Sequence, residues 1–432
     1  MAEHPLLAHG RDVPVIDGQR VVSRQAYLGQ LRTLARALPA GDAVINLCED
    51  RYSFLLAFGA ALLRSQVTLL PPNRSPETVA MVAATHGPVE VIDDATVQAL
   101  VEETSGPGDE AIPQLALEQA AATVFTSGTT GTPLPNRKDL GTLVEGARRV
   151  DERLGLSPGC GIVATVPPQH MFGLEMSVML PLVRGKRLLP ERPFFPVDIA
   201  AALGRLAGPR VLFTTPLHLR ACLREEGVEW PAIERIVVST APLAVELAQA
   251  AEARLGCPVT EIYGSSETGA LATRATATTE EWSCLSGVRI RHEGGAVKAG
   301  GGHIPEPVTL NDSVEVRSPT TFRLLGRGED LVDRAGKRAS LGGLSQTLLA
   351  IKGVEDGVFL QPASSDGGAS RLIALVVAPT LNEEAIREEL RRWVDPVFLP
   401  RPLYKVDRLP RNELGKLPRE ALQTLLQQMG EE

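Results

Sequence analysis

The stretch at residues 125–133, which reads Phe-Thr-Ser-Gly-Thr-Thr-Gly-Thr-Pro, constrains this chain more than any other feature of its sequence. It follows directly on the apolar run at 121–124, which is typical of a buried strand. Glycine lets a backbone come close to an anion, and hydroxyl and backbone N–H groups donate hydrogen bonds to the anion's oxygens. The stretch therefore has the composition of a loop that holds phosphate groups, although a polar surface turn uses the same residue types.

Segments typical of strands and of helices alternate along the chain. Apolar spacing predicts helices at 23–39 and 52–63, and strands at 43–48, 67–70 and 89–92. A further helix is predicted at 140–154, with strands at 161–166, 211–215 and 235–239. Such alternation is typical of a parallel sheet with helices on both faces. We therefore predict an α/β fold whose large N-terminal domain consists of parallel-sheet α/β layers.

A domain boundary is predicted near residue 329. Beyond it, the sequence contains a clear strand at 371–377 and a capped helix with a charged face at 382–393. The remaining segment is long enough for a small domain of its own. We expect an N-terminal domain over 1–328 and a small α+β C-terminal domain over 329–432.

Composition and charge exclude several classes of protein. The net charge is −8, so there is no basic footprint for nucleic acid. No apolar run is long enough to span a membrane, and the N-terminus lacks the basic and apolar regions of a signal peptide. The five cysteines are scattered, without a Cys-x-x-Cys pair, which is typical of reduced thiols. These features predict a cytoplasmic protein that binds neither nucleic acid nor a membrane.

Further motifs follow the glycine-rich loop. They read Pro-Gln-His-Met-Phe-Gly at 168–173, Ser-Thr-Ala-Pro-Leu at 239–243, Tyr-Gly-Ser-Ser-Glu-Thr at 263–268 and Leu-Pro-Arg-Asn-Glu-Leu-Gly-Lys-Leu-Pro-Arg at 409–419. In the third of these, an aromatic ring can stack on a base, a hydroxyl can meet a phosphate, and a carboxylate can hold Mg²⁺. In this order the motifs resemble those of the adenylate-forming enzymes, which include acyl- and aryl-CoA synthetases, the adenylation domains of peptide synthetases, and luciferases.

The resemblance implies an ATP site made from several segments. In these enzymes the glycine-rich loop wraps the phosphates, the Ala-Pro turn passes under the adenine, and an Asp and an Arg further on hold the ribose. The expected ATP-binding residues are Thr126, Ser127, Gly128, Thr129, Thr130, Gly131, Ala241, Pro242, Tyr263, Gly264, Ser265, Ser266, Asp312 and Arg327.

The resemblance also implies which residues act on the acid and the metal. His170, Phe172 and Gly173 are expected to line the acid pocket, with His170 beside the reacting carboxylate. Glu267 is expected to bind Mg²⁺, and Lys416 to offset the repulsion between the carboxylate and the α-phosphate. His170, Glu267 and Lys416 are thus the expected catalytic residues. Glu329 holds the position of the acidic hinge about which the C-terminal domain turns.

The sequence departs from the family pattern at three of these sites. Residues 133–136 read Pro-Leu-Pro-Asn, so the lysine that usually follows this proline is missing. Arg137 and Lys138 can supply the charge, or they can form a solvated basic pair, and both interpretations stay open. Thr240 stands where a glycine is usual, and Leu-Asn at 310–311 replaces the usual Thr-Gly.

The resemblance implies an AMP-forming acid–thiol ligase. Such an enzyme joins a carboxylic acid to ATP as an acyl-adenylate, and then passes the acyl group to a thiol of coenzyme A or of the phosphopantetheine arm of an acyl carrier protein. The compact chain is most similar to carrier-protein ligases of the aryl-polyene type, with an aromatic or other acyl substrate. Two alternatives stay open: a degenerate member that binds nucleotide or acyl ligand without turnover, and an adenylating enzyme with a non-thiol acceptor.

Overall fold

The computed structural model describes residues 2–10, 15–16, 21–102, 111–127, 133–327, 331–334, 337–362, 371–412 and 415–430. The chain divides into two compact units, residues 1–308 (unit 1) and 309–432 (unit 2). The domain limit that the sequence suggested, between 328 and 329, stays a prediction. None of the described helices combines the length and the apolar character that crossing a membrane requires.

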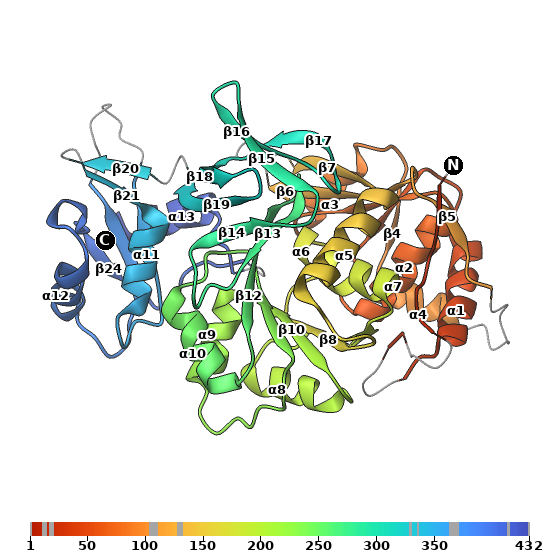
Figure 1. Cartoon of the computed structure of the whole chain (residues 1–432), viewed down its shortest axis with the longest axis horizontal. Helices are drawn as coiled ribbons and strands as arrows, with labels where there is room; N and C mark the ends of the chain where they lie inside the picture. Colours follow the sequence, from red (N-terminus) through yellow and green to blue (C-terminus); the bar gives the residue numbers. More distant parts are fainter. Residues whose placement is uncertain are drawn as a thin grey trace. The chain divides into compact units, whose positions relative to one another are not determined.

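The first sheet of unit 1 has the strand order β4-β2-β3-β6-β7. Figure 1 labels β4, β6 and β7 of this sheet. Its strands are β2 (Ala43–Asn46), β3 (Val67–Leu70), β4 (Glu90–Ile92), β6 (Ala120–Ser127) and β7 (Pro133–Asp139). The first four strands pair in parallel, and β7 returns antiparallel to β6. The helices around it are α1 (Arg24–Ala37), α2 (Arg51–Leu63), α3 (Pro76–Ala83) and α4 (Asp94–Glu102). A short ladder of β1 (Glu3–Pro5) and β5 (Gln114–Ala116) lies outside this sheet.

Local signals explain why these helices begin where they do. The Ser23 hydroxyl accepts a hydrogen bond from the Ala26 N–H at 3.2 Å, and the Asp50 carboxylate accepts one from the Ser53 N–H at 2.9 Å. These N-caps satisfy backbone donors that the first turn of each helix leaves unpaired. Helix α2 is buried on nearly every side, which agrees with its almost wholly apolar sequence.

The second sheet of unit 1 contains the parallel strands β9, β8, β10, β11 and β12, in that order, followed by β13 and β14. Their bounds are β8 (Gly161–Ala164), β9 (Arg187–Leu188), β10 (Arg210–Thr214), β11 (Arg235–Val238), β12 (Val259–Ser265), β13 (Gly269–Arg274) and β14 (Glu281–Cys284). β13 is antiparallel to both β12 and β14. The parallel-sheet α/β layers expected from the sequence are therefore confirmed.

Helices of this part cover the second sheet and fill the space toward the first. They are α5 (Leu140–Leu154), α6 (Met171–Leu174), the π-helix η1 (Glu175–Met179), α7 (Leu180–Arg184), α8 (Pro196–Arg205), α9 (Pro216–Arg224) and α10 (Val245–Leu255). The π-helix η1 packs against α2, α5 and β8, so it lies in the interior of unit 1. A three-stranded sheet of β15 (Val288–Glu293), β16 (Ala296–Gly301) and β17 (Ile304–Thr309) follows.

Unit 2 is a smaller α+β unit with its own apolar core. It begins with the hairpin of β18 (Asp312–Ser318) and β19 (Thr321–Arg327). The rest contains β20 (Leu331–Arg334), β21 (Lys337–Ser340), α11 (Leu341–Ala350), β22 (Asp356–Leu360), β23 (Ile373–Val377), α12 (Glu383–Trp393), a 3₁₀ turn at Pro396–Phe398, β24 (Leu403–Lys405) and α13 (Arg419–Gly430). Its core packs α11 and α12 onto the sheet β22-β23-β24.

Candidate active site

The loops at one edge of the second sheet carry several of the residues that the sequence analysis singled out. β8, β10, β11 and β12 run parallel, so their carboxyl ends lie at the same edge. The predicted motifs at 168–173, 239–243 and 263–268 all follow or end these strands. Ligands of open α/β sheets bind outside the carboxyl ends of the strands. The structure thus brings three motifs that are far apart in sequence to one place in unit 1.

The 168–173 motif forms the start of a helix. His170 is the N-cap of α6, with extended backbone angles, and its side chain is half-buried. The ring of Phe172 meets the ring of Phe213 on β10 edge-on, with 6.3 Å between the ring centres. Gly173 lies so close to the preceding loop that a Cβ atom added to it would stand 1.9 Å from the Pro167 carbonyl oxygen. Glycine at 173 is therefore required for α6 to begin against this loop.

The 239–243 turn is tied to the strand that carries the next motif. The Ser239 hydroxyl donates to the Ile262 carbonyl at 2.9 Å, and the Leu243 N–H donates to the buried Glu261 carboxylate at 3.0 Å. Ala241 is half-buried and Pro242 is exposed. Thr240 has a φ of +82°, a left-handed conformation that a β-branched residue rarely adopts. The departure from glycine noted in the sequence therefore falls where the backbone favours glycine.

The 263–268 motif forms the end of β12 and its turn into β13. Tyr263 packs on Trp282 with 5.6 Å between ring centres, and a bulge lies between Tyr263 and Gly264. The Ser265 N–H donates to the Thr268 hydroxyl at 3.1 Å, and this bond closes the turn. Within the turn, Ser265 and Glu267 are exposed and Ser266 is half-buried. The Glu267 carboxylate thus faces solvent from a turn whose backbone is held internally.

The two basic residues that the sequence analysis left unresolved lie in different environments. Arg137 is largely exposed on β7, and its side chain lies 3.7 Å from the Asp139 carboxylate. Lys138 is buried, and its ammonium donates to the Glu267 carbonyl oxygen at 2.6 Å. Burial lowers the pKa of Lys138, while the charges of Glu175 and Glu267 act in the opposite direction. A solvated pair is therefore wrong for Lys138, and a role of either residue at the phosphates stays a prediction.

The other expected ATP residues of unit 1 belong to the glycine-rich loop. Thr126 and Ser127 are the last two residues of β6. Gly128, Thr129, Thr130 and Gly131 lie outside the described residues, as does the expected hinge residue, Glu329.

In unit 2, Asp312 and Arg327 are brought together. They are direct partners at the open end of the β18–β19 hairpin. The pairing places the two residues that the resemblance assigned to the ribose side by side, although fifteen positions separate them along the chain.

Lys416 stands on a tight turn of unit 2. Its N–H donates to the Asn412 side chain at 2.9 Å, and its carbonyl accepts from the Asn412 N–H at 2.8 Å. Arg411 anchors the turn through two hydrogen bonds of 2.6 Å to the Asp356 carboxylate. The Lys416 side chain is exposed. Lys416 thus combines a backbone held by hydrogen bonds to Asn412 with an exposed side chain.

The donor set of the site fits Mg²⁺ bound together with phosphates. Among the residues that the structure describes, no group of three or more His, Cys, Asp or Glu side chains is placed to hold a metal by itself. Mg²⁺ keeps several waters and binds one or two carboxylates plus substrate phosphates. An exposed Glu267 beside the Ser265 and Ser266 hydroxyls matches that mode.

Sequence reasoning missed two buried ionisable residues behind the 263–268 motif, Glu175 and His303. Glu175 begins η1 and is buried, and His303 lies buried between β16 and β17. A signal for Glu175 existed, because it is the one charged residue in the mostly apolar run at 171–183. His303 lies in a glycine-rich stretch and gave no comparable signal.

His218 was missed as well. It lies in the first turn of α9, where its Nδ1 is 2.9 Å from the Thr215 hydroxyl and 3.4 Å from the Thr165 hydroxyl. The ring of Phe194 meets it edge-on at 5.0 Å. Burial lowers the pKa of His218 to about 4, so the imidazole is neutral. His218 and the hydroxyls of Thr165 and Thr215 therefore form a buried polar group at the ends of β8 and β10.

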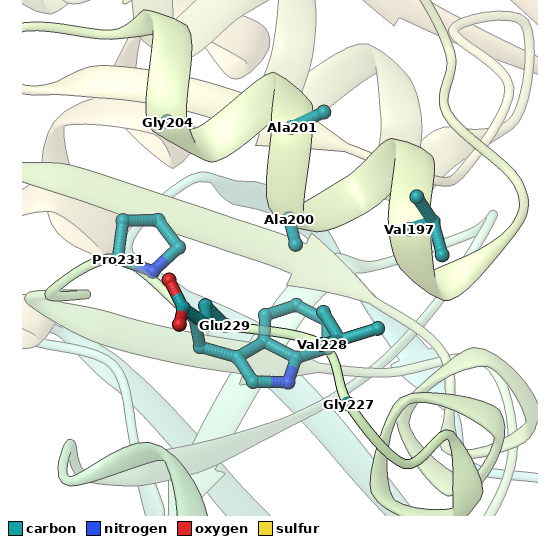
Figure 2. Close-up of a pocket in the computed structure, with 9 residues that line it drawn as sticks. Val197, Ala200, Ala201, Gly204, Gly227, Val228, Glu229 and Pro231 are labelled. Carbon is teal, nitrogen blue, oxygen red and sulfur yellow. The ribbon is translucent and has the colours of Figure 1, made fainter.

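A hollow elsewhere in unit 1 is separate from these motifs. It lies between α8 and the segment 227–231, and Figure 2 shows Val197, Ala200 and Pro231 among its lining residues. None of the lining residues, all of which the structure describes, is one of the predicted site residues.

Comparisons with known proteins agree with this arrangement. The model of the AMP-binding enzyme family matches residues 9–293. The chain is 31% identical over 276 residues to the 4-coumarate–CoA ligase of Rhodobacter capsulatus, covering 63% of this chain and 67% of that protein. It is 27% identical over 334 residues to the probable 2-succinylbenzoate–CoA ligase of Mycobacterium tuberculosis, covering 71% and 84% of the two chains.

A solved structure shows the same fold. The O-succinylbenzoate coenzyme A synthetase of Bacillus subtilis in complex with AMP aligns with a TM-score of 0.80 at 18% identity, covering 97% of this chain and 98% of that one. The family match extends over more than half of this chain. The chain therefore belongs to the AMP-binding enzyme family, the adenylate-forming acid–CoA ligases.

Proposed function

We propose that this enzyme activates a carboxylic acid with ATP and then transfers the acyl group to a thiol. The observation that carries the proposal is the meeting of the 168–173, 239–243 and 263–268 motifs at one edge of the parallel sheet. The relatives named as CoA ligases support the joining of an acid to a thiol.

In the first step an oxygen of the acid's carboxylate attacks the α-phosphorus of ATP. The bond from that phosphorus to the β-phosphate bridge breaks, and pyrophosphate leaves with the electron pair. Tyr263 and the 241–242 backbone hold the adenine, Asp312 and Arg327 hold the ribose, and the Lys416 ammonium offsets the negative charge that gathers at phosphorus. A bound Mg²⁺ would neutralise phosphate charge, and Glu267 would hold it.

In the second step a thiol sulfur attacks the carbonyl carbon of the acyl-adenylate, and AMP leaves. We propose that the C-terminal domain expected from the sequence, residues 329–432, carries Lys416 away between the steps by turning about Glu329. The acceptor is coenzyme A or the phosphopantetheine arm of a carrier protein, which end in the same thiol. The names of the relatives support coenzyme A.

The acid is proposed to be aromatic. His170, Phe172 and Gly173 come from the motif assigned to the acid, and the Phe172–Phe213 ring pair offers an aromatic wall. Relatives named for coumarate, hydroxybenzoate and succinylbenzoate support a planar aryl group.

The test is ATP–pyrophosphate exchange over a panel of aryl, fatty and amino acids. Exchange is expected with aryl acids, and Lys416→Ala should lower its rate on the order of 10²–10³-fold. Lys352→Ala, which removes another exposed lysine of unit 2, is the matched control and should exchange at the wild-type rate. Binding of ATP without exchange for any acid would overturn the proposal in favour of a degenerate binding protein.

The acceptor is tested by adding coenzyme A or a carrier protein bearing phosphopantetheine to the enzyme and its best acid. Mass spectrometry then shows which thiol becomes acylated. If the enzyme catalyses ATP–pyrophosphate exchange but acylates neither thiol, and an acylated amine is found instead, the thiol step is wrong and the acceptor is not a thiol.

A further inference from the structure

Three buried ionisable side chains converge on the back of the turn that carries Glu267. Lys138 comes from β7, Glu175 begins η1, and His303 lies between β16 and β17, and their exposed fractions are 5%, 3% and 4%. We call them the Lys138–Glu175–His303 cluster. All three belong to unit 1, and nothing in the adenylation step described above uses them directly.

Each member holds a different backbone group of the same turn. The Lys138 ammonium donates to the Glu267 carbonyl at 2.6 Å. Nε2 of His303 lies 3.1 Å from the Thr268 carbonyl, so Nε2 carries the proton. The Glu175 carboxylate accepts from the Ala270 N–H, with its two oxygens at 3.2 and 3.0 Å. Residues 267–270 are thereby fixed from three separate elements.

The close packing around the turn excludes a side chain at position 269. Gly269 has a φ of +68°, and a Cβ atom added to it would stand 2.5 Å from a Glu175 oxygen. Glu175 also begins a π-helical turn, a rare feature that is frequent at functional sites.

Such a cluster is costly in free energy. Burial raises the pKa of Glu175 to about 7 and lowers that of His303 to about 4. Removing charged groups from water costs more than a pair of opposite charges usually returns, so an apolar packing of the same volume is often more stable. A stability role alone does not explain why ionisable groups stand here. Their shared effect is to fix the backbone on either side of an exposed carboxylate.

We propose that Lys138, Glu175 and His303 are positioning residues that hold the 267–270 backbone so that the Glu267 carboxylate points at the Mg²⁺–phosphate site. The inference rests on the proposed function of Glu267. The three residues act through the turn, not on the substrate. Because groups that orient a metal ligand typically change metal affinity 10–100-fold when they are removed, the cluster should set the Mg²⁺ dependence of ATP binding.

The experiment measures binding of ATP by calorimetry over a series of Mg²⁺ concentrations, with AMP as a ligand that lacks the β- and γ-phosphates. In Lys138→Met we expect the Mg²⁺ concentration for half-maximal ATP affinity to rise on the order of tenfold. Binding of AMP should stay within about twofold of wild type, because the cluster bonds to the backbone of residues 267, 268 and 270, and the adenine and ribose are assigned to other residues. Equal losses for both ligands would overturn the inference.

Lys186→Met is the matched control for simple loss of a buried lysine. Lys186 is 2% exposed, pairs with Asp151 at 2.9 Å, and donates to the Leu156 and Ser157 carbonyls, far along the chain from the turn. It should lower the melting temperature without moving the Mg²⁺ dependence. If it shifts that dependence as much as Lys138→Met does, the cluster is only structural and the inference fails.

A second pair of variants keeps the test decisive if Lys138→Met does not fold. His303→Leu removes the donor to the Thr268 carbonyl and should shift the Mg²⁺ dependence, whereas His303→Gln supplies an amide N–H and should recover most of it. Equal behaviour of the two variants would refute the positioning role. Failure of wild type itself to bind ATP would instead refute the proposed function.

Discussion

The contact between Gly173 and the loop before it gives the sharpest prediction about the acid pocket. An alanine Cβ at 173 would stand 1.9 Å from the Pro167 carbonyl oxygen, 2.7 Å from its carbon and 3.1 Å from the Pro168 Cα. All three are backbone atoms, so no side-chain rotation relieves the clash. Bringing the first distance to 3.0 Å requires a relative shift of about 1 Å between α6 and the loop, and overpacking of this kind typically costs about 1–3 kcal/mol.

The expected change in melting temperature follows from the size of unit 1. With its 308 residues and an unfolding entropy of about 2.1 cal/mol/K per residue, each kcal/mol lowers the melting temperature by about 1.5 °C. Gly173→Ala should therefore melt about 2–5 °C below wild type in circular dichroism. Because misplacement by about 1 Å can cost on the order of 100-fold in rate, kcat/KM for the acid in pyrophosphate exchange should fall by a similar factor.

Gly204→Ala is the matched control, because nothing lies within 4 Å of a Cβ atom added at this position of α8. It should leave exchange unchanged and gain up to about 1 kcal/mol of stability from the higher helix propensity of alanine. A Gly173→Ala enzyme with the melting temperature and kcat/KM of wild type would refute the reasoning.

Two further predictions concern backbone strain and buried histidines. Thr240 has a φ of +82°, and a left-handed conformation costs a residue with a Cβ about 1–2 kcal/mol. Glycine avoids this cost but loses more backbone entropy on folding. Thr240→Gly should therefore raise the free energy of unfolding, measured in urea, by about 0.5–1 kcal/mol. A decrease would show that Thr240 is not strained. Burial lowers the pKa of His9, His218 and His303 from 6.5 to about 4, so between these values the unfolded chain binds protons that the folded chain excludes. Each histidine should lower stability by up to about 1.4 kcal/mol per pH unit as the pH falls from 6.5 toward 4, whereas Glu175, whose pKa burial raises to about 7, should offset the contribution of one of the three. Urea unfolding that is independent of pH over this range would contradict this expectation.

Elements with strong local signals were predicted from the sequence close to their observed bounds. The helix expected at 140–154 is α5, and the strand expected at 67–70 is β3. The helix expected at 382–393 is α12, and the Asn382 side chain caps it by accepting from the Ala385 N–H at 2.9 Å. Apolar periodicity and capping residues are local signals that extend over a few neighbouring positions. A single sequence is therefore enough to predict the elements that they define.

The supports of the candidate site depend on contacts that no local pattern contains. Lys138 lies 129 positions from Glu267, and Glu175 lies 95 positions from Ala270. A single sequence shows that a carboxylate stands among apolar residues, but not which backbone group it will bind. Likewise, the sequence showed threonine where glycine is usual, and only the φ angle of Thr240 shows what this departure costs.

The basic residues Arg137 and Lys138 are neighbours in the sequence, but the fold places their side chains in different environments. Successive side chains of a strand point to opposite faces, so on β7 one of the pair must face inward when the other faces outward. Pairing with β6 sets Arg137 opposite Thr123 and Lys138 opposite Ala122. The inward lysine donates to the Glu267 carbonyl and so contacts the turn rather than solvent. Of the two, Arg137 is the residue whose charge stands in solvent, and Arg137→Gln is therefore the variant that tests direct compensation for the missing loop lysine.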